Sequence, residues 1–560
     1  MSLKVPTGAG PQLFKQTTNL QGIEDAVIRN IHAVNGTPHF SSNYAKLNYF
    51  LGRTFGNFIN HLQKLFLTND AATIIKELDV VHPAAKILVM ASQQQESEVY
   101  LSKFSFSLPF SRAGLWTDFF WELLKKAESL LTMGLHPSEI IKGYEMAQDY
   151  TLKTLNELAI DKVSDTKSKT ELAKAIKTAI ASKQYGNEDL LSELVAEAVL
   201  AVMPKNPLNF NIDNVRVVKV MGSNLVESKV VRGMVFAREP EGRVTKAGRS
   251  KVAVYSCGID IGQTETKGTV LLHNAKEMLE FSKGEEAQME DSIKQIWDAG
   301  VRVVVSGGAI GDLALHFLNR FDILVVKVLS KFDLRRLCRV VGATPLARVG
   351  APMPEEMGNI DIVETVEIGG DRVTVFRQEN EVTKTATIVL RGATQNRLDD
   401  VERAIDDGVN VVKAIAKDPR LVPGAGATEM ELFKRTFAFG EKTPGIFQHV
   451  IKKYAEAFEV VPRTLAETAG LDATDVLSKL HAAHHKNDDG VMGVDIDEQG
   501  CGSLVDANER GILDVLSAKH WAVRLATDAA LTILAVDQII MSKPAGGPKP
   551  PAQKANWDED

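Results

Sequence analysis

The segment "LRGATQNRLDDVERAIDDGVNVVKAIAKDPRLVPGAGATEMEL", Leu390–Leu432, carries the clearest pattern in the chain. Its first part predicts an amphipathic helix, because apolar side chains recur at helical spacing. The stripe consists of Leu398, Val401, Ile405, Val409 and Val412. Its last part predicts a glycine turn that opens a second helix. Gly424 and Gly426 allow a close approach of the backbone, and a helix N-terminus offers free N–H groups to an anion.

Two carboxylates stand at positions that allow a functional and a purely structural interpretation. At about 100° per residue, Asp407 falls opposite Leu398, off the apolar stripe. It is either a solvated aspartate or an acid that reaches across a gap between domains. Asp70 lies in "KLFLTNDAATIIKEL" (Lys64–Leu78), which predicts a strand, a turn and a helix. It is either a helix N-cap or a carboxylate beside a phosphate or a metal.

Length and composition bound the protein class. A chain of 560 residues is expected to contain more than one hydrophobic core. The net charge of −7 argues against a bulk nucleic-acid binder. Three isolated cysteines fit a reducing compartment without structural zinc. No run of about 18 apolar residues is present, so no membrane span is expected, and a cytosolic or nuclear protein is the default expectation.

The pattern along the chain changes from helical to mixed and back. Residues 119–200 are mostly helical in pattern, about 214–368 alternate strands with helices, and the chain is helical again from Thr394 to Ser542. This order suggests that one helical domain is built from both chain ends. The segment Asn274–Trp297 predicts a long polar helix. The last residues, 542–560, are rich in Pro and Gly and predict a disordered tail.

Two weaker motifs favour structural roles. "SGGAIGD" (Ser306–Asp312) follows a predicted strand, but its spacing is GGxxG, so a tight strand-to-helix turn is favoured over a dinucleotide loop. "HAAHH" (His481–His485) lacks a third ligand and an orienting acid, which favours a surface helix over a zinc site.

Taken together and in order, a set of segments resembles the group II chaperonins of the T-complex protein 1 family. They are TNDAATIIKELDVVHPAAKILV, GMVFAREPEG, ETKGTVLL, LRRLCRVVGATPL, LRGATQNRLDDVERAIDDGVNVVK, VPGAGATEMEL, VVPRTLAETAGLDATDVL and ATDAALTILAVDQII. The resemblance covers roughly Asn60–Glu98 and Glu122–Trp557.

The resemblance implies an α+β multidomain chaperonin fold. A helical equatorial domain comes from both chain ends (1–148 and 409–541), and a small α/β intermediate domain comprises 149–213 and 369–408. An α/β apical domain (214–368) binds substrate, and the helix Asn274–Trp297 resembles its protrusion, which forms a built-in lid. Residues 542–560 form the tail.

The resemblance also assigns site residues, with ATP and Mg²⁺ as the implied cofactors. Asp70 matches the carboxylate near the γ-phosphate, and Asp407 matches the acid that orients the attacking water. The implied nucleotide contacts are Ser182, Lys183, Gly424, Ala425, Gly426, Asp514 and Lys519. The helix Lys331–Val341 resembles the wall of the substrate groove, with Leu334, Arg335, Leu337 and Arg339 as its contacts.

The implied function is that of a cytoplasmic, ATP-dependent folding machine. The family forms hetero-oligomeric double rings, so seven paralogous subunits are the implied partners, with no nucleic acid and no membrane. Unfolded proteins, cytoskeletal proteins such as actin and tubulin among them, are the implied substrates.

The chain departs from the family pattern at both phosphate loops. The GDGT segment, whose Asp holds Mg²⁺, is absent, and Tyr100–Trp121 with its eight aromatic residues stands in its place. The LGPxGxxK loop is also absent, since the chain reads "LNYFLGRTFGNFIN" there. Two alternatives follow: a structural ring member without hydrolysis, or a gene model with misassigned introns. We expect residues 100–121 to be poorly ordered or to pack outside the equatorial core, because large apolar side chains do not fit a phosphate site.

Overall fold

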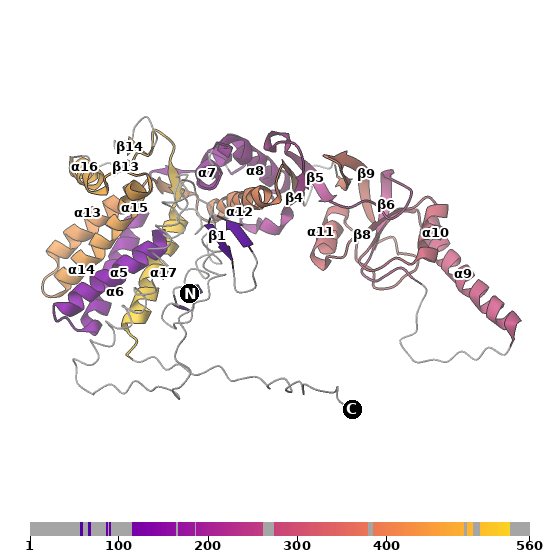
Figure 1. The fold of residues 1–560 in the computed structure, drawn as a ribbon, viewed down its shortest axis with the longest axis horizontal. Helices are drawn as coiled ribbons and strands as arrows, with labels where there is room; N and C mark the ends of the chain where they lie inside the picture. Colours follow the sequence, from indigo (N-terminus) through magenta and orange to yellow (C-terminus); the bar gives the residue numbers. More distant parts are fainter. Residues whose placement is uncertain are drawn as a thin grey trace, which may run out of the picture.

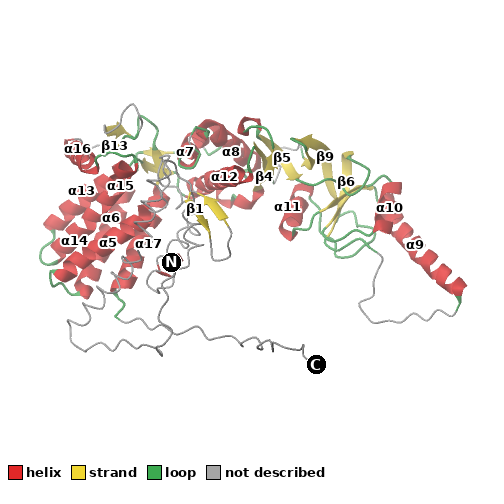
Figure 2. Ribbon diagram, in the orientation of Figure 1, coloured by secondary structure: helices red, strands yellow, loops and turns green. Residues whose placement is uncertain are grey.

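The computed structural model describes residues 56–59, 65–68, 86–87, 89–90, 115–163, 166–184, 186–260, 274–378, 385–486, 490–496 and 504–537. The molecule is elongated, with a helical part at one end, a middle part, and a far part from which one helix projects (Figure 1). Helices dominate the first part, and most strands lie in the other two (Figure 2).

Segments from distant regions of the chain form the helical part. It contains α5 (Leu115–Thr132), α6 (Pro137–Glu157), α13 (Ala427–Lys442), α14 (Phe447–Glu456), α15 (Val460–Thr468), α16 (Ala473–Lys486) and α17 (Leu516–Leu534). The α17 helix packs on both α5 and α6. Inside, the buried Tyr144 hydroxyl donates to the Leu123 carbonyl at 2.9 Å, which satisfies the one polar group of that ring. The predicted helical domain from both chain ends is confirmed.

The end of the aromatic stretch belongs to this core. Phe119 and Phe120 are 0% and 1% exposed. The Phe119 ring stacks on Phe458 at a centroid distance of 4.6 Å and meets the edge of Tyr454 at 6.1 Å. The expectation that residues 100–121 pack outside the core is therefore wrong for residues 119 and 120. The reason is that α5 begins at Leu115, which turns these rings toward α14 and the segment that follows it. Residues 100–114 lie outside the described residues.

The middle part packs three helices around one apolar core. They are α7 (Lys169–Ala181), α8 (Glu188–Val202) and α12 (Gln395–Lys417). The predicted stripe of α12, from Leu398 to Val412, is buried in this core. Gly408 is needed where α12 crosses α7, because an added Cβ would lie 3.0 Å from the Ile176 side chain.

A small antiparallel sheet connects the middle part to the helical part. Its strand order is β15-β12-β3, with β3 at Asp161–Lys162, β12 at Arg420–Pro423 and β15 at Leu513–Val515. Two hairpins lie apart from it, β1–β2 (Gly56–Ile59 and Leu65–Thr68) and β13–β14 (Met492–Val494 and Leu504–Asp506).

The far part and the middle part share a sheet of eight strands in the order β4-β11-β5-β10-β9-β6-β7-β8. The strands are β4 (Val215–Met221), β5 (Lys229–Phe236), β6 (Lys246–Tyr255), β7 (Val301–Ser306), β8 (Leu324–Lys327), β9 (Gly358–Ile368), β10 (Asp371–Arg377) and β11 (Ala386–Gly392). Short 3-10 helices occur at Pro207–Asn209, Ile212–Asn214, Leu225–Glu227 and Ala457–Glu459.

The strand β5 changes partner at Gly233. Its residues up to Arg232 pair with β11, and those from Gly233 onward pair with β10. Gly233 has a φ of 127°, and an added Cβ would collide with the carbonyl oxygen of Phe376. Only glycine fits this backbone conformation without strain, so the change of partner depends on that residue.

Helices cover both faces of the far part of the sheet. The helix α11 (Lys331–Val341) packs on the face of Val303 and Val305, whereas α9 (Ala275–Asp298) and α10 (Asp312–Arg320) pack on the face of Val304. This alternation follows from the two-residue period of a strand. The predicted long polar helix corresponds to α9, which extends away from the sheet (Figure 1).

Three further expectations can be compared with this fold. The glycines after β7 form a tight strand-to-helix turn, as predicted, because an added Cβ at Gly308 would lie 2.6 Å from the Gly258 nitrogen. The predicted domain limit between 368 and 369 falls in the turn of the β9–β10 hairpin, whose strands pair along their length, and the domain limits stay predictions. Among the described helices, none is long and apolar enough to cross a membrane.

Candidate functional site

The glycine turn between β12 and α13 has an unusual backbone. Ala425 and Gly426 have φ values of 54° and 80°, in the left-handed region. The Gly424 N–H donates to the Ile512 carbonyl at 2.9 Å, and the Ala425 carbonyl accepts from Val494 N–H at 2.9 Å. Within the described residues, no side chain of the N-cap Gly426 caps α13, and the Ala427 N–H donates to the Gly424 carbonyl at 3.0 Å. The remaining N–H groups of the first turn lack intrahelical partners and can donate to an external acceptor.

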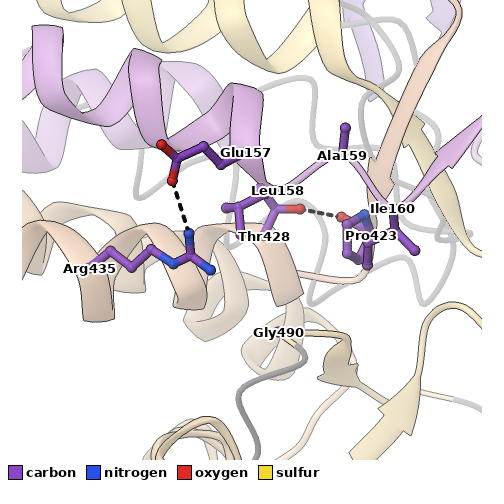
Figure 3. A pocket seen from close by; sticks show the side chains of 8 residues that line it. All are labelled: Glu157, Leu158, Ala159, Ile160, Pro423, Thr428, Arg435 and Gly490. Carbon is purple, nitrogen blue, oxygen red and sulfur yellow. Dashed lines mark hydrogen bonds and ion pairs between the residues drawn. The ribbon is translucent and has the colours of Figure 1, made fainter.

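A small pocket of about 110 Å³ adjoins this turn. It is lined by Glu157, Leu158, Ala159, Ile160, Pro423, Thr428, Arg435 and Gly490 (Figure 3). The Thr428 hydroxyl donates to the Pro423 carbonyl at 2.6 Å, which closes the turn, and Arg435 reaches toward Glu157 at 3.5 Å. Pockets for small organic ligands have about 300–1,000 Å³, so a ligand of nucleotide size would extend beyond this one.

Behind the turn, three charged side chains meet in the interior. The Lys519 ammonium of α17 lies 2.7 Å from Glu429 Oε1 of α13 and 3.1 Å from Asp514 Oδ2 of β15. We call this group the buried triad. Its position follows from the pairing of β12 with β15, in which Val422 lies opposite Asp514. Charges this deep are tolerated because they are paired.

Burial and mutual charge shift the proton affinities of the buried triad. Burial raises the pKa of Asp514 to about 6, with Lys519 acting to lower it and Glu429 acting to raise it. Burial alone would lower the pKa of Lys519, but the two carboxylates outweigh that effect and raise it. Lys519 therefore stays charged, and Asp514 is the member whose proton is exchanged near neutral pH.

Lys519 was expected to contact a nucleotide directly, and the geometry does not support that role. Its side chain is 1% exposed, and both carboxylates occupy its ammonium. Asp514, also expected at the nucleotide, keeps a little exposure at the edge of the triad. The physical reason is that Lys519 lies on the face of α17 that packs inward, where only a paired charge is stable.

Asp407 is neither solvated nor free to reach across a gap. Its carboxylate lies 2.9 Å from the Lys183 ammonium, and the two side chains are 5% and 2% exposed. The helix α7 packs across this face of α12 and buries it, which a single-helix pattern does not reveal. Ser182, the residue before Lys183, is also buried and donates to the Ala179 carbonyl.

The same face of α12 carries another buried acid. Asp400 is 2% exposed, and Arg403 donates to it at 2.6 Å. Burial raises the pKa of Asp400, while the charges of Arg403 and Lys183 act to lower it. A row of paired charges therefore follows the side of α12 that the sequence pattern assigned to solvent.

The predicted substrate residues divide between two faces of α11. Their contact with substrate stays a prediction, and in the structure Leu334 and Leu337 are 5% and 0% exposed and pack on the sheet. The reason for this packing is that an amphipathic helix turns its apolar stripe toward the sheet. Arg335 and Arg339 are exposed. They share the outer surface with Phe332, which is 71% exposed and was not predicted.

Three further sequence positions can be compared with the structure: Asp70, Glu429 and the histidine motif. Asp70 is not among the described residues. Glu429 was missed, because an acid in the first turn of a helix is ordinarily explained by the helix dipole alone. In the "HAAHH" motif, His484 is buried between Glu431 and the Met492 carbonyl, and among the described side chains no group suited to a metal ion is present.

Comparison with known proteins decides the family. A model of the TCP-1/cpn60 chaperonin family matches residues 57–100 and 119–544. The chain belongs to the TCP-1/cpn60 chaperonin family. The match is interrupted at residues 101–118, within the aromatic stretch that stands where the sequence pattern expects GDGT.

This chaperonin is similar over its full length to curated relatives. It is 60% identical to a probable T-complex protein 1 subunit theta of Schizosaccharomyces pombe, with 100% of both chains covered. It is 50% identical to T-complex protein 1 subunit theta of Saccharomyces cerevisiae and 48% identical to that of Homo sapiens, again with 100% of each chain covered. The family resemblance of the sequence motifs and the predicted fold class are confirmed.

Proposed function

We propose that this chaperonin is a cytoplasmic ring subunit that binds and hydrolyses ATP in order to enclose and fold unfolded proteins. The observation that carries the proposal is the convergence of the expected nucleotide residues on one small sheet. The Gly424–Gly426 turn follows β12, and Asp514 lies on β15, which pairs with β12. The Thr178 hydroxyl of α7 donates to the Leu513 carbonyl at 3.0 Å, which brings the end of α7, before Lys183, to the same sheet.

Each group then has a chemical task in the proposed site. The N–H groups of the glycine turn and of the first turn of α13 donate to phosphate oxygens. Asp514 accepts from a sugar hydroxyl, and Lys519 acts through Asp514 rather than by contact. The Lys183 ammonium is attracted to the terminal phosphate, which releases Asp407 to accept a proton from the attacking water.

Mg²⁺, which the family resemblance implies, stays a prediction, because Asp70 and most of the segment that stands in place of GDGT lie outside the described residues. Within the described part of the chain no three His, Cys, Asp or Glu side chains gather as a metal site. Asp407 and Asp514 are already engaged by lysines. No step of the proposed mechanism is therefore assigned to the metal.

The proposed substrate surface is the outer face of α11. Phe332 and the neighbouring Leu329, at 71% and 56% exposure, offer apolar contacts, and Arg335 and Arg339 add positive charge. Exposed apolar surface of this kind marks a binding site. Unfolded chains, including cytoskeletal proteins, are the proposed substrates, and paralogous subunits are the proposed ring partners.

A second candidate function is a ring subunit that does not hydrolyse ATP. It is favoured by the interruption of the family match at residues 101–118 and by the absence of both phosphate-loop motifs. The packing of Phe119 and Phe120 in the core argues that the end of the aromatic stretch is a genuine part of the chain. A gene-model error, if present, then ends before these residues.

The test compares the chain as written with a version in which GDGT and LGPxGxxK loops are restored, each with and without Asp407→Ala. We expect weak ATP binding and no hydrolysis by the chain as written. The restored chain should hydrolyse ATP, and Asp407→Ala should lower its turnover by on the order of 10²-fold with nearly unchanged ATP affinity, as for loss of a general base. Equal loss of affinity and turnover would assign Asp407 a structural role.

A further inference from the structure

The members of the buried triad differ in their access to solvent. The side chains of Glu429 and Lys519 are 0% and 1% exposed, whereas that of Asp514 is 4% exposed. All three are buried, Lys519 lies between the two acids, and the little exposure that remains belongs to Asp514. We call the Asp514 side of the triad its mouth.

The ammonium of Lys519 is directed toward Glu429. It donates a hydrogen bond to Glu429 Oε1 at 2.7 Å. Asp514 Oδ2 lies 3.1 Å from the same nitrogen in a less favourable geometry, and this buried oxygen has no other hydrogen-bond partner within the described residues. Two carboxylates thus share one ammonium, and Asp514 is only partly neutralised.

We propose that Glu429 is a positioning residue: by holding Lys519 on the side opposite the mouth, it keeps Asp514 available as an acceptor for a neutral hydroxyl donor at the mouth of the triad. The proposal rests on the proposed nucleotide function, and it adds which end of the nucleotide faces the triad. The triad carries one excess negative charge, which repels phosphate and accepts a sugar hydroxyl. The phosphates are then directed to the N–H groups of the glycine turn.

The proton affinity of Asp514 makes this contact depend on pH. Burial raises the pKa of Asp514 to about 6, and Glu429 adds to that rise while Lys519 opposes it. The other elements that pack on β15 are α7, α12 and β12. In the described residues they contribute no charge that shifts this pKa. Above pH 6 the carboxylate accepts a charge-assisted hydrogen bond from a hydroxyl, and below pH 6 the group binds a proton and becomes a weaker acceptor.

The test uses adenosine, because it has the sugar hydroxyls but no phosphate and is therefore independent of the missing phosphate loops. Binding of adenosine and of 2′,3′-dideoxyadenosine is measured between pH 5 and 8 for the wild type and for Glu429→Gln. The matched control is Glu441→Gln on the same helix, whose side chain is 57% exposed. A parallel arm without ligand follows the carboxyl titration of Asp514 by infrared difference spectra against Asp514→Asn.

Glu429→Gln should weaken adenosine binding at pH 7 on the order of 10-fold, because Lys519 then turns to Asp514 and competes with the hydroxyl. Binding of the dideoxy analogue should not change. The midpoint of the Asp514 titration should move to lower pH, since a charge that raised it is gone, and Glu441→Gln should move neither readout.

An unchanged titration together with unchanged adenosine affinity would overturn the role of Glu429. If the wild type binds neither adenosine nor ADP, the proposed nucleotide function fails instead, and the titration arm alone then decides whether Glu429 controls Asp514.

Discussion

The ion pair between Lys183 and Asp407 makes each partner costly to remove. Both side chains are almost fully buried at a separation of 2.9 Å, so loss of the lysine leaves an aspartate charge with little solvent. Breaking a buried pair in this way costs about 3–5 kcal/mol. A pair on the surface contributes less than about 1 kcal/mol.

We therefore expect Lys183→Met to lower the free energy of unfolding by about 3–5 kcal/mol, and Lys183→Met/Asp407→Asn to recover a large part of the loss. Lys177→Met is the control, because Lys177 pairs at 2.6 Å with Asp189 while both side chains are 47% or more exposed. Urea unfolding followed by circular dichroism measures all three. Equal effects of the Lys183 and Lys177 substitutions would contradict the importance of burial.

The residues that could be predicted are those whose role depends only on their neighbours in the sequence. The Gly424–Gly426 turn was predicted from its glycines and from the helical pattern that follows, although short glycine-rich turns are common and the motif alone is a weak signal. The partner of Asp407 could not be predicted, because Lys183 comes from the turn after α7 and only the packing of α7 on α12 brings the two residues together. The same holds for Glu429, whose function depends on a strand and a helix from the C-terminal region.

At the level of elements, α5 shows the largest difference from expectation. Phe119 is fully buried and contacts Phe458 and Tyr454 through its ring. We expect Phe119→Ala to destabilise the helical part by about 3–5 kcal/mol, as for other buried aromatic residues. Phe332→Ala, at 71% exposure, should change stability by less than about 0.5 kcal/mol. Thermal unfolding compares them, and similar midpoints would mean that Phe119 is not a core residue.

The helices α11 and α12 show what the spacing of apolar residues can predict about a helix and what it cannot. On α12 the predicted stripe is the buried one. On α11 the same rule places Leu334, Leu337, Cys338 and Val341 on the sheet, and the expectation from family resemblance had turned two of them outward. Periodicity thus identifies the inner face of a helix, whereas the identity of the polar side chains on the other face depends on what packs there.

At the scale of the molecule, the chain is an elongated arrangement of three parts (Figure 1). The exposed Met133 and Ile446 of the helical part, at 59% and 49%, are single apolar side chains of a kind common on protein surfaces. The expectation of a larger assembly therefore comes from the family match. We expect native mass measurement of cell extract to find this chain mainly in assemblies far larger than its own 61.2 kDa. A single species at 61.2 kDa would contradict a ring subunit.

The change of partner at Gly233 has a mechanical consequence. The strand β5 belongs to the middle part before this residue and to the far part after it, so a rotation of its backbone angles tilts one half of the sheet against the other. A change of the Gly233 backbone angles would displace the tip of α9 most, because the tip lies at the far end of the molecule (Figure 1). The extent of such a tilt is limited by an apolar cluster with Val218, Val235 and Val373, which crosses the junction between the two halves.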